Sequence, residues 1–497
     1  MKINNLIVSF LAVSVCAAVG AQTSYDAAKL YEEELNGTAR YVGMGGAMSA
    51  LGSDASVISH NPAGIGTYHN SDINLSLGFF GTSVNMDPLY TASFKGATEN
   101  GLQYYSNNSK SDLNMALDNV SFIFSGYDGD DTYMNFGFSY RKLQNMDRFM
   151  DYRDKFYIYD NNEVRDVRYH WYEDHQRNKI NSFDFNLSCN LSDIVYLGWT
   201  LGILGTDTWS EGYFYDFLPS YQNAEQEDKY LLQPTDGIVD STSVDKMNTA
   251  NGSGWNMAFG LIIRPVRALR LGVSVKTPTW YRQELDYVDY LYAFMGDDYT
   301  DENGNAIAEN RSVIYKFSSP WSLNLSAGLT FAKTAIGVEY EKHFTQRSSL
   351  SIGNTKMTTQ GAIDYQDYSS VKFGIEQNIS NLSLRAGYNY IESMFNNNSY
   401  PYLFDSEFNN DNPVGRMDFQ NDRLGKTQYC TCGIGYCSTP DRDGTQFYID
   451  LAYVHGIRRS VLNMNEYDFG LTEYNFDTDV NYKYITDKVL LTVGWNF

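Results

Sequence analysis

Six ionisable side chains on three neighbouring stretches have the spacing that chemistry at a shared site would need. Two of the stretches alternate polar and apolar residues, so the six side chains point to one side of the predicted strands. The six are Glu339, Glu341, His343, Lys372, Glu376 and Arg385. Carboxylates, an imidazole and two kinds of cation at this spacing can relay protons, hold a metal ion or form a solvated network of ion pairs. The fold that positions them decides between these readings.

Other chemical patterns in the sequence are sparse. His170 and His175 lie in an aromatic, polar stretch, for which a site for a planar ligand such as haem is the alternative to the default interpretation, an exposed loop. The chain has six histidines in total. No nucleophile elbow and no H-E-x-x-H motif occurs. We therefore expect no enzyme activity, no metal and no cofactor, with a hydrolase whose residues meet only in space as a third option.

The cysteines do not indicate a set of structural disulfide bonds. One of the five, Cys16, lies in the apolar N-terminal run, and the others are Cys189, Cys430, Cys432 and Cys437. Cys430 and Cys432 are two residues apart and so share one face of a strand. No metal-binding spacing accompanies them, which favours structural or lipid-facing cysteines over a disulfide or a metal site.

Strict alternation is the main structural signal. From Ser322 to Phe331, apolar residues alternate with Ser, Asn, Gly and Thr, which is typical of a half-buried strand. The same pattern recurs about fourteen times along the chain. The predicted strands lie near 72–80, 118–126, 132–142, 179–189, 194–204, 255–263, 268–277, 320–331, 334–344, 369–378, 382–392, 427–437, 445–455 and 485–497.

The connections between these strands alternate in length. Six are short turns and seven are long, polar segments rich in Tyr and Asp. Membrane barrels use short turns in the periplasm and long loops outside, whereas a soluble sandwich or propeller has no reason to alternate in this way. The sequence therefore predicts an all-β fold, a transmembrane antiparallel β-barrel of about fourteen strands formed by residues 72–497.

A membrane barrel also settles how the six ionisable side chains should be read. Lipid-facing residues are apolar and the lumen is polar, so a solvated network of lumen-lining side chains is the expected arrangement. The last strand alternates and ends at Trp495 and Phe497, which resembles the C-terminal signal recognised by the barrel assembly machinery. We expect that machinery and outer-membrane lipid as partners, and a monomer.

The net charge and the N-terminal residues indicate where in the cell the protein is located. The formal net charge of −23 excludes nucleic acid as a partner, because phosphates require Lys and Arg. Residues 1–21 have a positive start, a short apolar run and a small-residue cleavage site, which predicts a signal peptide. No later stretch offers the roughly 20 apolar residues of a spanning helix. The chain is thus expected in the outer membrane of a Gram-negative cell.

Residues 22–71 differ in character from the strands. Tyr25 to Leu35 predicts a short amphipathic helix, and a glycine-rich stretch follows. Asp54 can cap a helix or turn, and Asn61-Pro62 favours the start of a turn. A phosphate-binding loop is excluded, since the glycines lack a preceding strand and a Lys-Ser/Thr pair. We call residues 22–71 the hatch segment and expect it inside the barrel.

The hatch segment carries a family resemblance. It resembles the N-terminal signature of FadL/TodX-type outer-membrane transporters, with the motif residues Gly43, Gly45, Gly46, Asp54, Asn61, Pro62, Ala63 and Gly64. The resemblance implies a fourteen-stranded barrel plugged by a hatch, passage of hydrophobic molecules such as long-chain fatty acids, and lateral release through the wall. Barrels of the type IX secretion shuttle kind look similar here, so an interaction barrel that binds secreted proteins is the alternative function.

A lateral exit needs a strand whose ladder is broken. The first hairpin is the predicted place, because the hatch segment enters beside it and Gly78 lies within its first strand. Gly78 either interrupts that strand or makes room in the lumen.

Overall fold

The computed structural model describes most of the chain. It covers residues 28–89, 103–106, 109–110, 113–127, 131–160, 163–219, 238–295, 307–345, 348–352, 355–357, 365–395, 421–442, 444–466 and 476–497. The expected signal peptide, residues 1–21, lies outside these residues. Within them, no helix is both long and apolar enough to cross a membrane.

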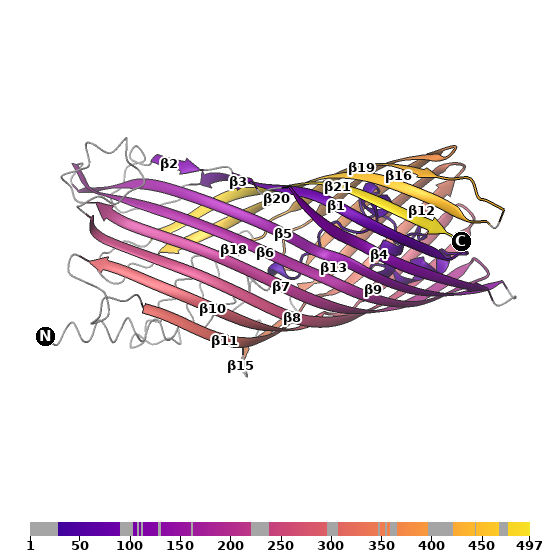
Figure 1. The fold of residues 1–497 in the computed structure, drawn as a ribbon, viewed down its shortest axis with the longest axis horizontal. Helices are drawn as coiled ribbons and strands as arrows, with labels where there is room; N and C mark the ends of the chain where they lie inside the picture. The colour runs from indigo at the N-terminus through magenta and orange to yellow at the C-terminus, as the bar shows by residue number, and fades with distance from the viewer. Residues whose placement is uncertain are drawn as a thin grey trace.

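Fourteen antiparallel wall strands form a closed barrel, as the sequence predicted (Figure 1). The last strand pairs with the first from Asp72↔Asn496 to Leu89↔Asp479, which closes the wall. Two wall strands consist of two pieces each, β9 with β10 and β11 with β12. The wall comprises β1 (Asp72–Leu89), β4 (Asn114–Tyr127), β5 (Thr132–Asp160), β6 (Glu163–Leu191), β7 (Val195–Pro219), β8 (Ile238–Val266), β9 (Leu269–Lys276), β10 (Trp280–Met295), β11 (Ile307–Ser318), β12 (Trp321–Phe331), β13 (Thr334–Phe344), β16 (Tyr368–Ile379), β17 (Leu382–Ile391), β19 (Thr427–Cys437), β20 (Gln446–Glu466) and β21 (Phe476–Asn496).

Five short strands lie beside the wall. β3 (Ser109–Lys110) pairs with β1 and β2 (Gln103–Ser106) pairs with β5. β14 (Ser349–Ile352) pairs with β11 and with β15 (Thr355–Met357). β18 (Asn421–Arg423) pairs with β20 ahead of β19.

Apolar side chains of the wall point outward and polar ones inward. Along β12, Leu325 and Leu329 are exposed while Ser322 and Asn324 are buried. Exposed Phe136, Phe185, Leu384 and Leu451 continue this apolar band on other strands, whereas Ser139, Thr200 and Thr492 are buried. A closed barrel that exposes its apolar face is stable only in lipid, so these strands span a membrane.

Short turns join the strands at the end where the chain terminates (Figure 1). Asp131, Ser192, Ala332 and Ser380 adopt positive φ values between 52° and 57° in these turns. A left-handed residue of this kind lets antiparallel strands reverse within very few residues. The predicted short connections are therefore turns.

Several segments predicted as long loops are strands, which corrects that expectation. β5 and β6 remain paired from Thr132↔Leu191 to Asp160↔Glu163, far beyond the predicted bounds of 142 and 179. β7 and β8 extend in the same way, to Pro219↔Ile238. Polar residues occupy both faces along part of these extensions, as in the run from Glu173 to Lys179, although β5 also buries Leu143, Met146 and Met150. The regular alternation that marks a strand is therefore weak here.

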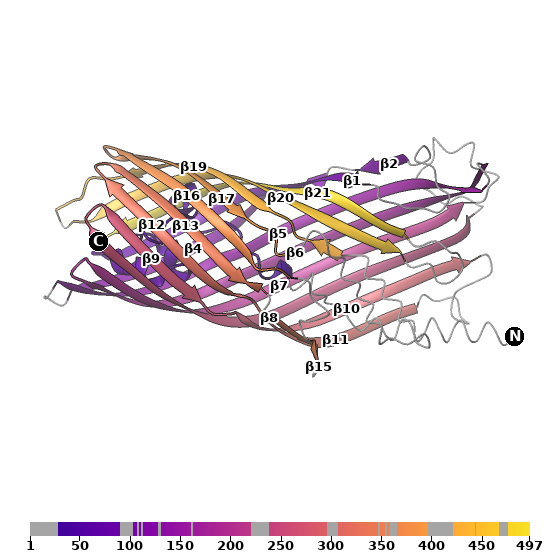
Figure 2. The ribbon, with the colours of Figure 1, turned by 180° about the vertical axis from the view of Figure 1, so that it is seen from behind.

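Two neighbouring strands break at one level of the wall. Residues 277–279 separate β9 from β10, and Ser319-Pro320 separates β11 from β12. Figure 2 shows β9 and β12 on one side of this break and β10 and β11 on the other. Proline has no N–H for the ladder, and hydroxyls take over part of the pairing: the Thr279 amide donates to Ser319 Oγ at 2.8 Å. The wall bends here.

A second irregularity lies in the first hairpin. The ladder between β4 and β5 ends at Asn119↔Arg141, although β4 continues to pair with β1 as far as Phe80↔Asn114. Beyond Arg141, on the side away from the short turns, a side chain connects β5 to β1: Thr82 Oγ1 donates to the carbonyl oxygen of Asp147 at 2.7 Å. Gly78 itself lies within continuous β1, and a Cβ there would be 1.8 Å from Asp118 Oδ2. Of the two readings of Gly78, making room in the lumen fits.

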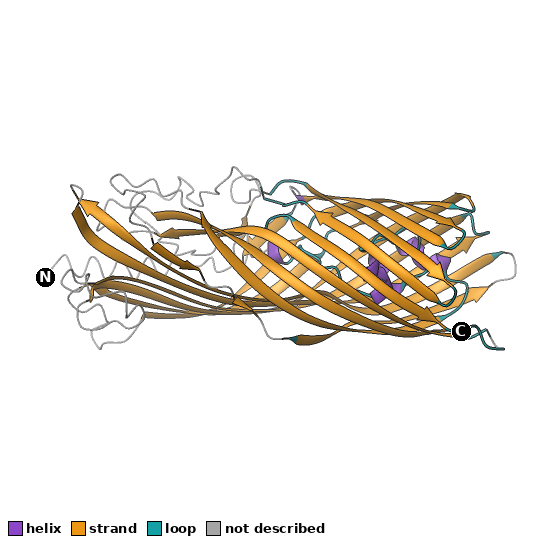
Figure 3. Ribbon diagram, turned by 90° about the horizontal axis from the view of Figure 1, so that it is seen from above, coloured by secondary structure: helices purple, strands orange, loops and turns teal. Residues whose placement is uncertain are grey.

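The described part of the hatch segment, residues 28–71, is nearly all buried inside the barrel. Figure 3 shows its short helices within the wall, towards the end where the C-terminus lies. They are α3 (Ala39–Gly43) and the 3-10 helices η1 (Ala55–Ser59) and η2 (Pro62–Thr67). The helix predicted over Tyr25–Leu35 is wrong for its described second half, because residues 32–35 are not helical; three consecutive glutamates there bind different strands.

Candidate functional site

Glycines of the wall form the surface on which the hatch segment rests. At Gly337 a Cβ atom would lie 1.8 Å from the carbonyl oxygen of Ala47, and at Gly374 it would lie 2.3 Å from that of Met44. Separations under 3 Å from hatch atoms also apply to Gly198, Gly260, Gly272, Gly328 and Gly387. At Gly272 and Gly328 these hatch atoms belong to side chains that can move, whereas at the other five glycines they include backbone atoms, with which a side chain would collide. The wall is therefore shaped to hold this segment.

The predicted motif glycines lie at the matching positions of the hatch segment. Gly45 has φ +64°, and a Cβ there would be 2.7 Å from the backbone nitrogen of Tyr388. Gly46 has φ +79° and packs against Tyr41. Gly43 ends α3 with its Cα against Gly433 of β19, where an added Cβ would be 3.5 Å away. Left-handed backbone and close approach both require glycine at Gly45.

The polar motif residues begin the two 3-10 helices. Asp54 accepts a hydrogen bond from the Ser56 amide at 2.9 Å and two from Thr38 Oγ1 at 2.9 and 2.7 Å. Asn61 accepts from the Ala63 amide at 3.2 Å, with Pro62 as the first residue of η2. These side chains satisfy amides that a helix start leaves free.

Ala63 and Gly64 of the motif are fully buried parts of η2. Ala63 packs with Tyr196 of β7 and Ile262 of β8. The Gly64 carbonyl oxygen accepts a hydrogen bond from Thr67 Oγ1 at 2.7 Å. The motif thus fixes both the internal shape of the hatch segment and its contact with the wall.

Replacing the Asp54 cap should loosen η1 measurably. Asp54→Ala removes an N-cap acceptor worth about 1–2 kcal/mol, so hydrogen exchange at the amides of His60 and Asn61 should become roughly five- to thirty-fold faster. Asp54→Asn keeps an acceptor oxygen and should exchange close to the wild-type rate. Equal acceleration in both variants would show that charge, and not capping, stabilises η1.

An ion-pair chain joins the hatch segment to the wall near the turn end. Arg40 binds Glu376 of β16 through two hydrogen bonds of 2.9 and 3.0 Å, and donates to the Ser53 carbonyl oxygen at 2.8 Å. Glu376 also accepts from Arg385 of β17 at 2.6 Å, and Arg385 reaches Asp450 of β20 at 2.5 Å. The structure thus places Glu376 and Arg385 together, with a hatch arginine as a third member.

A polar vestibule lies on the turn side of this chain. Its volume is about 650 Å³, and Arg40, Asp54, Glu376, Arg385 and Asp450 are among the residues that line it. Charged and polar walls of this kind hold water, so an apolar solute would gain nothing by entering it.

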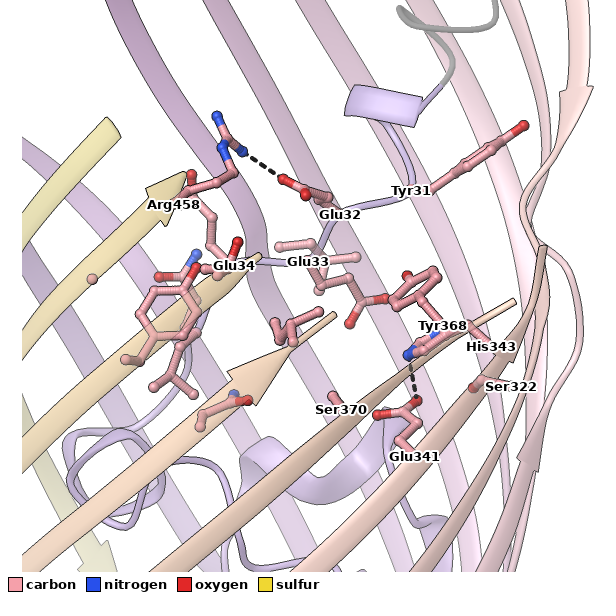
Figure 4. Close-up of a pocket in the computed structure, with 18 of the residues that line it drawn as sticks. Tyr31, Glu32, Glu33, Glu34, Ser322, Glu341, His343, Tyr368, Ser370 and Arg458 are labelled. Atoms are coloured by element: carbon pink, nitrogen blue, oxygen red, sulfur yellow. Dashed lines mark hydrogen bonds and ion pairs between the residues drawn. The ribbon is translucent and has the colours of Figure 1, made fainter. Parts of the chain in front are cut away.

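The other four predicted lumen residues form a second cluster, centred on Lys372. Lys372 Nζ lies 3.3 Å from Glu341 and 3.6 Å from Glu339. Glu339 accepts a hydrogen bond of 2.5 Å from the Ser49 amide of the hatch segment. His343 lies 3.8 Å from Glu341 and stacks on Tyr368, with ring centroids 4.4 Å apart (Figure 4). This cluster therefore also holds the hatch segment.

Three consecutive hatch glutamates reach three parts of the wall. Glu32 accepts a hydrogen bond from Arg458 of β20 (Figure 4). Glu33 pairs with Lys276 at the end of β9. Glu34 accepts from a backbone amide of β5 at 3.2 Å. The extended chain at residues 32–34 directs these carboxylates to β20, β9 and β5. They span the lumen from wall to wall.

The charge state of the hatch groups follows from their surroundings. Burial works to raise the pKa of Glu33, but Lys276 and His60 outweigh it and lower that pKa to about 2. Burial raises the pKa of Glu34 despite the opposing influence of Lys488. Burial lowers the pKa of His60 to about 3, which keeps this imidazole neutral at physiological pH. The Glu33–Lys276 contact is thus ionic over the physiological range.

An amphipathic cavity of about 130 Å³ lies against these glutamates. One part of its lining is apolar and includes Leu30, Tyr31, Leu143, Ile180, Tyr281 and Met394. The other part is charged and includes Glu32, Glu33, Lys276, Glu341, His343 and Arg458. Tyr281 stacks on Phe317 at 4.7 Å and belongs to a cluster of buried apolar side chains above the hatch segment. A molecule with an apolar chain and a polar head fits such a lining.

The remaining predicted residues lie on or near the outer surface. Trp495 is exposed with its ring 5.3 Å from that of Phe447, and Phe497 exchanges two backbone hydrogen bonds of 2.9 Å with Ser71. Cys430 and Cys432 are exposed free thiols. Cys189 and Cys437 are also free. Side-chain placement at His170 lies outside the described residues, and His175 bonds to Asp147 at 2.8 Å. Among the described residues no group of three or more acids, histidines or cysteines could hold a metal ion.

Two components of the site were missed by sequence reasoning. Gly337 and Gly374 of the wall were not predicted to contact the hatch segment. Glycine recurs on the polar side of neighbouring strands, however, and this recurrence could have indicated the contact. Glu32 to Glu34 read as the polar face of a helix. Nothing local to those glutamates indicates Lys276 or Arg458 as partners.

Comparison with known proteins adds information on the fold alone. No protein-family model matches the sequence, and no curated protein matches it either. A FadL homologue of Pseudomonas aeruginosa superposes with a TM-score of 0.58 at 15% identity, covering 93% of this chain and 99% of that one. The Pseudomonas putida toluene transporter TodX gives 0.53 at 14%, covering 93% and 99%. The monoaromatic hydrocarbon channel CymD gives 0.51 at 13%, covering 92% and 97%. The chain therefore has the fold of the FadL/TodX-type outer-membrane transporters.

Proposed function

We propose that this chain carries hydrophobic small molecules such as long-chain fatty acids across the outer membrane, without enzymatic chemistry. The observation that supports the proposal most directly is the amphipathic cavity on top of a buried hatch segment. Its apolar side chains suit an alkyl chain, and its floor is made of hatch carboxylates bound to wall cations. The solved structures of similar fold are hydrocarbon channels and a FadL homologue by description.

The orientation follows from the barrel. The short turns and the C-terminus would face the periplasm, and the projecting hairpins β5–β6 and β7–β8 would face the outside. The signal peptide at residues 1–21 would direct export, and Trp495 and Phe497 would guide insertion by the barrel assembly machinery. The protein would work as a monomer, because its lumen and hatch segment come from one chain.

A fatty acid would act on the hatch segment by exchange of carboxylates. Glu32 and Glu33 already occupy Arg458 and Lys276. An incoming carboxylate at either cation would release the glutamate bound there, and with it part of the extended chain at residues 32–34. The exchange keeps the number of ion pairs constant, so burial of the alkyl chain can drive it at about 0.8 kcal/mol per CH₂.

Lateral release would follow at the first hairpin, where the β4–β5 ladder ends at Asn119↔Arg141. Just beyond this point side chains connect β5 to β1 and β21, as in the 2.9 Å bond from Arg148 to Tyr482 of β21. Such bonds can open without unzipping a strand. An alkyl chain that leaves sideways enters lipid, whereas the polar vestibule below offers it only water.

A matched pair of ligands tests this proposal. Purified protein in proteoliposomes should take up palmitate and palmityl alcohol faster than empty liposomes. Lys276→Met with Arg458→Met should slow palmitate uptake about tenfold or more while changing alcohol uptake far less, since only the acid needs these cations. Failure of the wild type to bind or pass either compound, or an aromatic hydrocarbon such as toluene, would remove the main support for transport.

The alternative is an interaction barrel that binds secreted proteins, and the length of the projecting hairpins favours it. β5 and β6 are each 29 residues long and remain paired throughout. Pull-down from detergent extracts separates the two functions. Secreted proteins recovered in stoichiometric amounts would support the interaction barrel, and lipid recovered without protein would support transport.

A further inference from the structure

A groove of about 700 Å³ lies on the wall where β9/β10 and β11/β12 are broken. Its lining includes Leu201, Ile203, Trp255, Trp280, Arg282 and Lys316. The side chains of Trp255 and Trp280 are 45% and 40% exposed, and their ring centroids are 4.4 Å apart. The bend at Pro278 and Pro320 sets the upper strand pieces at an angle to the lower ones (Figure 2). The groove is thus part of the wall's architecture and faces away from the lumen.

The groove lies at the upper edge of the apolar band. On β8, outward-facing Trp255 is followed towards the turn end by Phe259 and Ile263, which are exposed and apolar. In the other direction Ser253 and Asn251 are exposed and polar. Tryptophan prefers the depth at which lipid headgroups meet the hydrocarbon. The groove therefore spans the boundary between acyl chains and headgroups.

Two cations lie side by side at this boundary. Arg282 of β10 and Lys316 of β11 are directly opposite each other in the ladder, and both are exposed. Neither makes a hydrogen bond or ion pair with another residue in the described part of the chain. The neighbouring acid on β10, Glu284, accepts a hydrogen bond from Ser312 at 3.3 Å.

Adjacent like charges are unfavourable across a ladder unless an anion lies between them. The chain as a whole has 60 acids against 37 Lys and Arg, so paired cations stand out on it. An anionic amphiphile would complement this groove, which offers two free cations, a pair of indole rings and the aliphatic side chains of Leu201 and Ile203. Its charged head would lie between Arg282 and Lys316, and its chains would lie along the wall.

We propose that this groove binds the phosphorylated headgroup of an outer-leaflet glycolipid. The phosphate accepts charge-assisted hydrogen bonds from Arg282 and Lys316, with the exposed Ser253 hydroxyl within the same groove. The acyl chains pack on Trp280, Leu201 and Ile203. The inference uses the proposed orientation, in which this edge faces outward, and is independent of what passes through the lumen.

Native mass spectrometry of the full-length protein with added bis-phosphorylated lipid A tests the site. Arg282→Gln with Lys316→Gln should retain the lipid roughly 30-fold more weakly, which corresponds to about 2 kcal/mol. The control is Arg177→Gln with Lys179→Gln, two exposed cations of β6 that lie away from the groove, and it should match the wild type. Heat-modifiable mobility on gels verifies that each barrel is folded.

Dephosphorylated lipid A supplies the second arm. The wild type should retain it as weakly as the groove variant retains the phosphorylated lipid. Equal retention of both lipids by the wild type would mean that the groove binds acyl chains alone, and would overturn the proposal. Equal loss in the groove and control variants would show unspecific charge attraction and would overturn it as well. A defect in palmitate uptake affects neither readout.

Discussion

Gly337→Ala should open the barrel to ions and large solutes. The added methyl carbon would lie 1.8 Å from the carbonyl oxygen of Ala47, a backbone atom with no freedom to rotate away. Overpacking of this kind costs about 1–3 kcal/mol, so the ratio of seated to displaced hatch segment should fall by roughly one to two orders of magnitude. Single-channel recordings in planar bilayers should show frequent large openings, and cells should become sensitive to bulky antibiotics.

A matched glycine separates this effect from a general loss of stability. Gly205 is also a wall glycine, but a Cβ there would meet nothing within 4 Å. Gly205→Ala should therefore retain wild-type conductance. Gly374→Ala should reproduce the open phenotype, because its Cβ would lie 2.3 Å from the Met44 carbonyl oxygen. Wild-type conductance in both Gly337→Ala and Gly374→Ala, with folded barrels, would mean that the hatch segment does not close the pore.

Tying the hatch segment to the wall should abolish uptake reversibly. A Cβ on Gly272 would lie 3.5 Å from the Cβ of Ala50, which is within the range that a disulfide spans. In a background without the native cysteines, oxidised Ala50→Cys/Gly272→Cys protein should transport palmitate no faster than empty liposomes. Reduction should restore transport, because the barrel itself is unchanged.

A staple inside the hatch segment provides the control. A Cβ on Gly64 would lie 3.5 Å from the Cβ of Val57, so Val57→Cys/Gly64→Cys can form a bond of the same kind without touching the wall. This variant should keep its uptake when oxidised if the hatch segment moves as a unit. Full uptake by the oxidised Ala50–Gly272 staple would exclude hatch movement as a step in transport.

Alternation predicted the membrane part of the wall well. The bounds 334–344 and 427–437 are those of β13 and β19. These strands have lipid on one side and the lumen on the other, so each residue's polarity reports its face. The segments 143–178 and 205–254 offered no such contrast. Polar residues occupy both faces along runs such as Glu173–Lys179, and a hairpin of this kind is indistinguishable from a loop by polarity.

The site was predictable in part. Local rules pointed to Asp54 as a cap and to Asn61-Pro62 as the start of a turn, because the amides that Asp54 and Asn61 bind are only two residues away. The inward side of Glu341, Lys372 and Glu376 followed from strand periodicity. Their partners did not, since a contact such as Glu33–Lys276 joins residues 243 positions apart. No periodicity encodes which lumen cation a hatch carboxylate will meet.

The contacts of the hatch segment also constrain the order of events in folding. Its Ala39 amide donates to Thr492 Oγ1, 453 residues later, and Asn36 is bound by Lys488, 452 residues later. The part of the chain that leaves the ribosome first therefore acquires its final partners only after the last strand has been synthesised. Closing so large a loop is slow compared with zipping adjacent hairpins. The hatch segment can therefore complete its contacts only when β21 has joined the wall, so plugging and closure of the barrel are coupled.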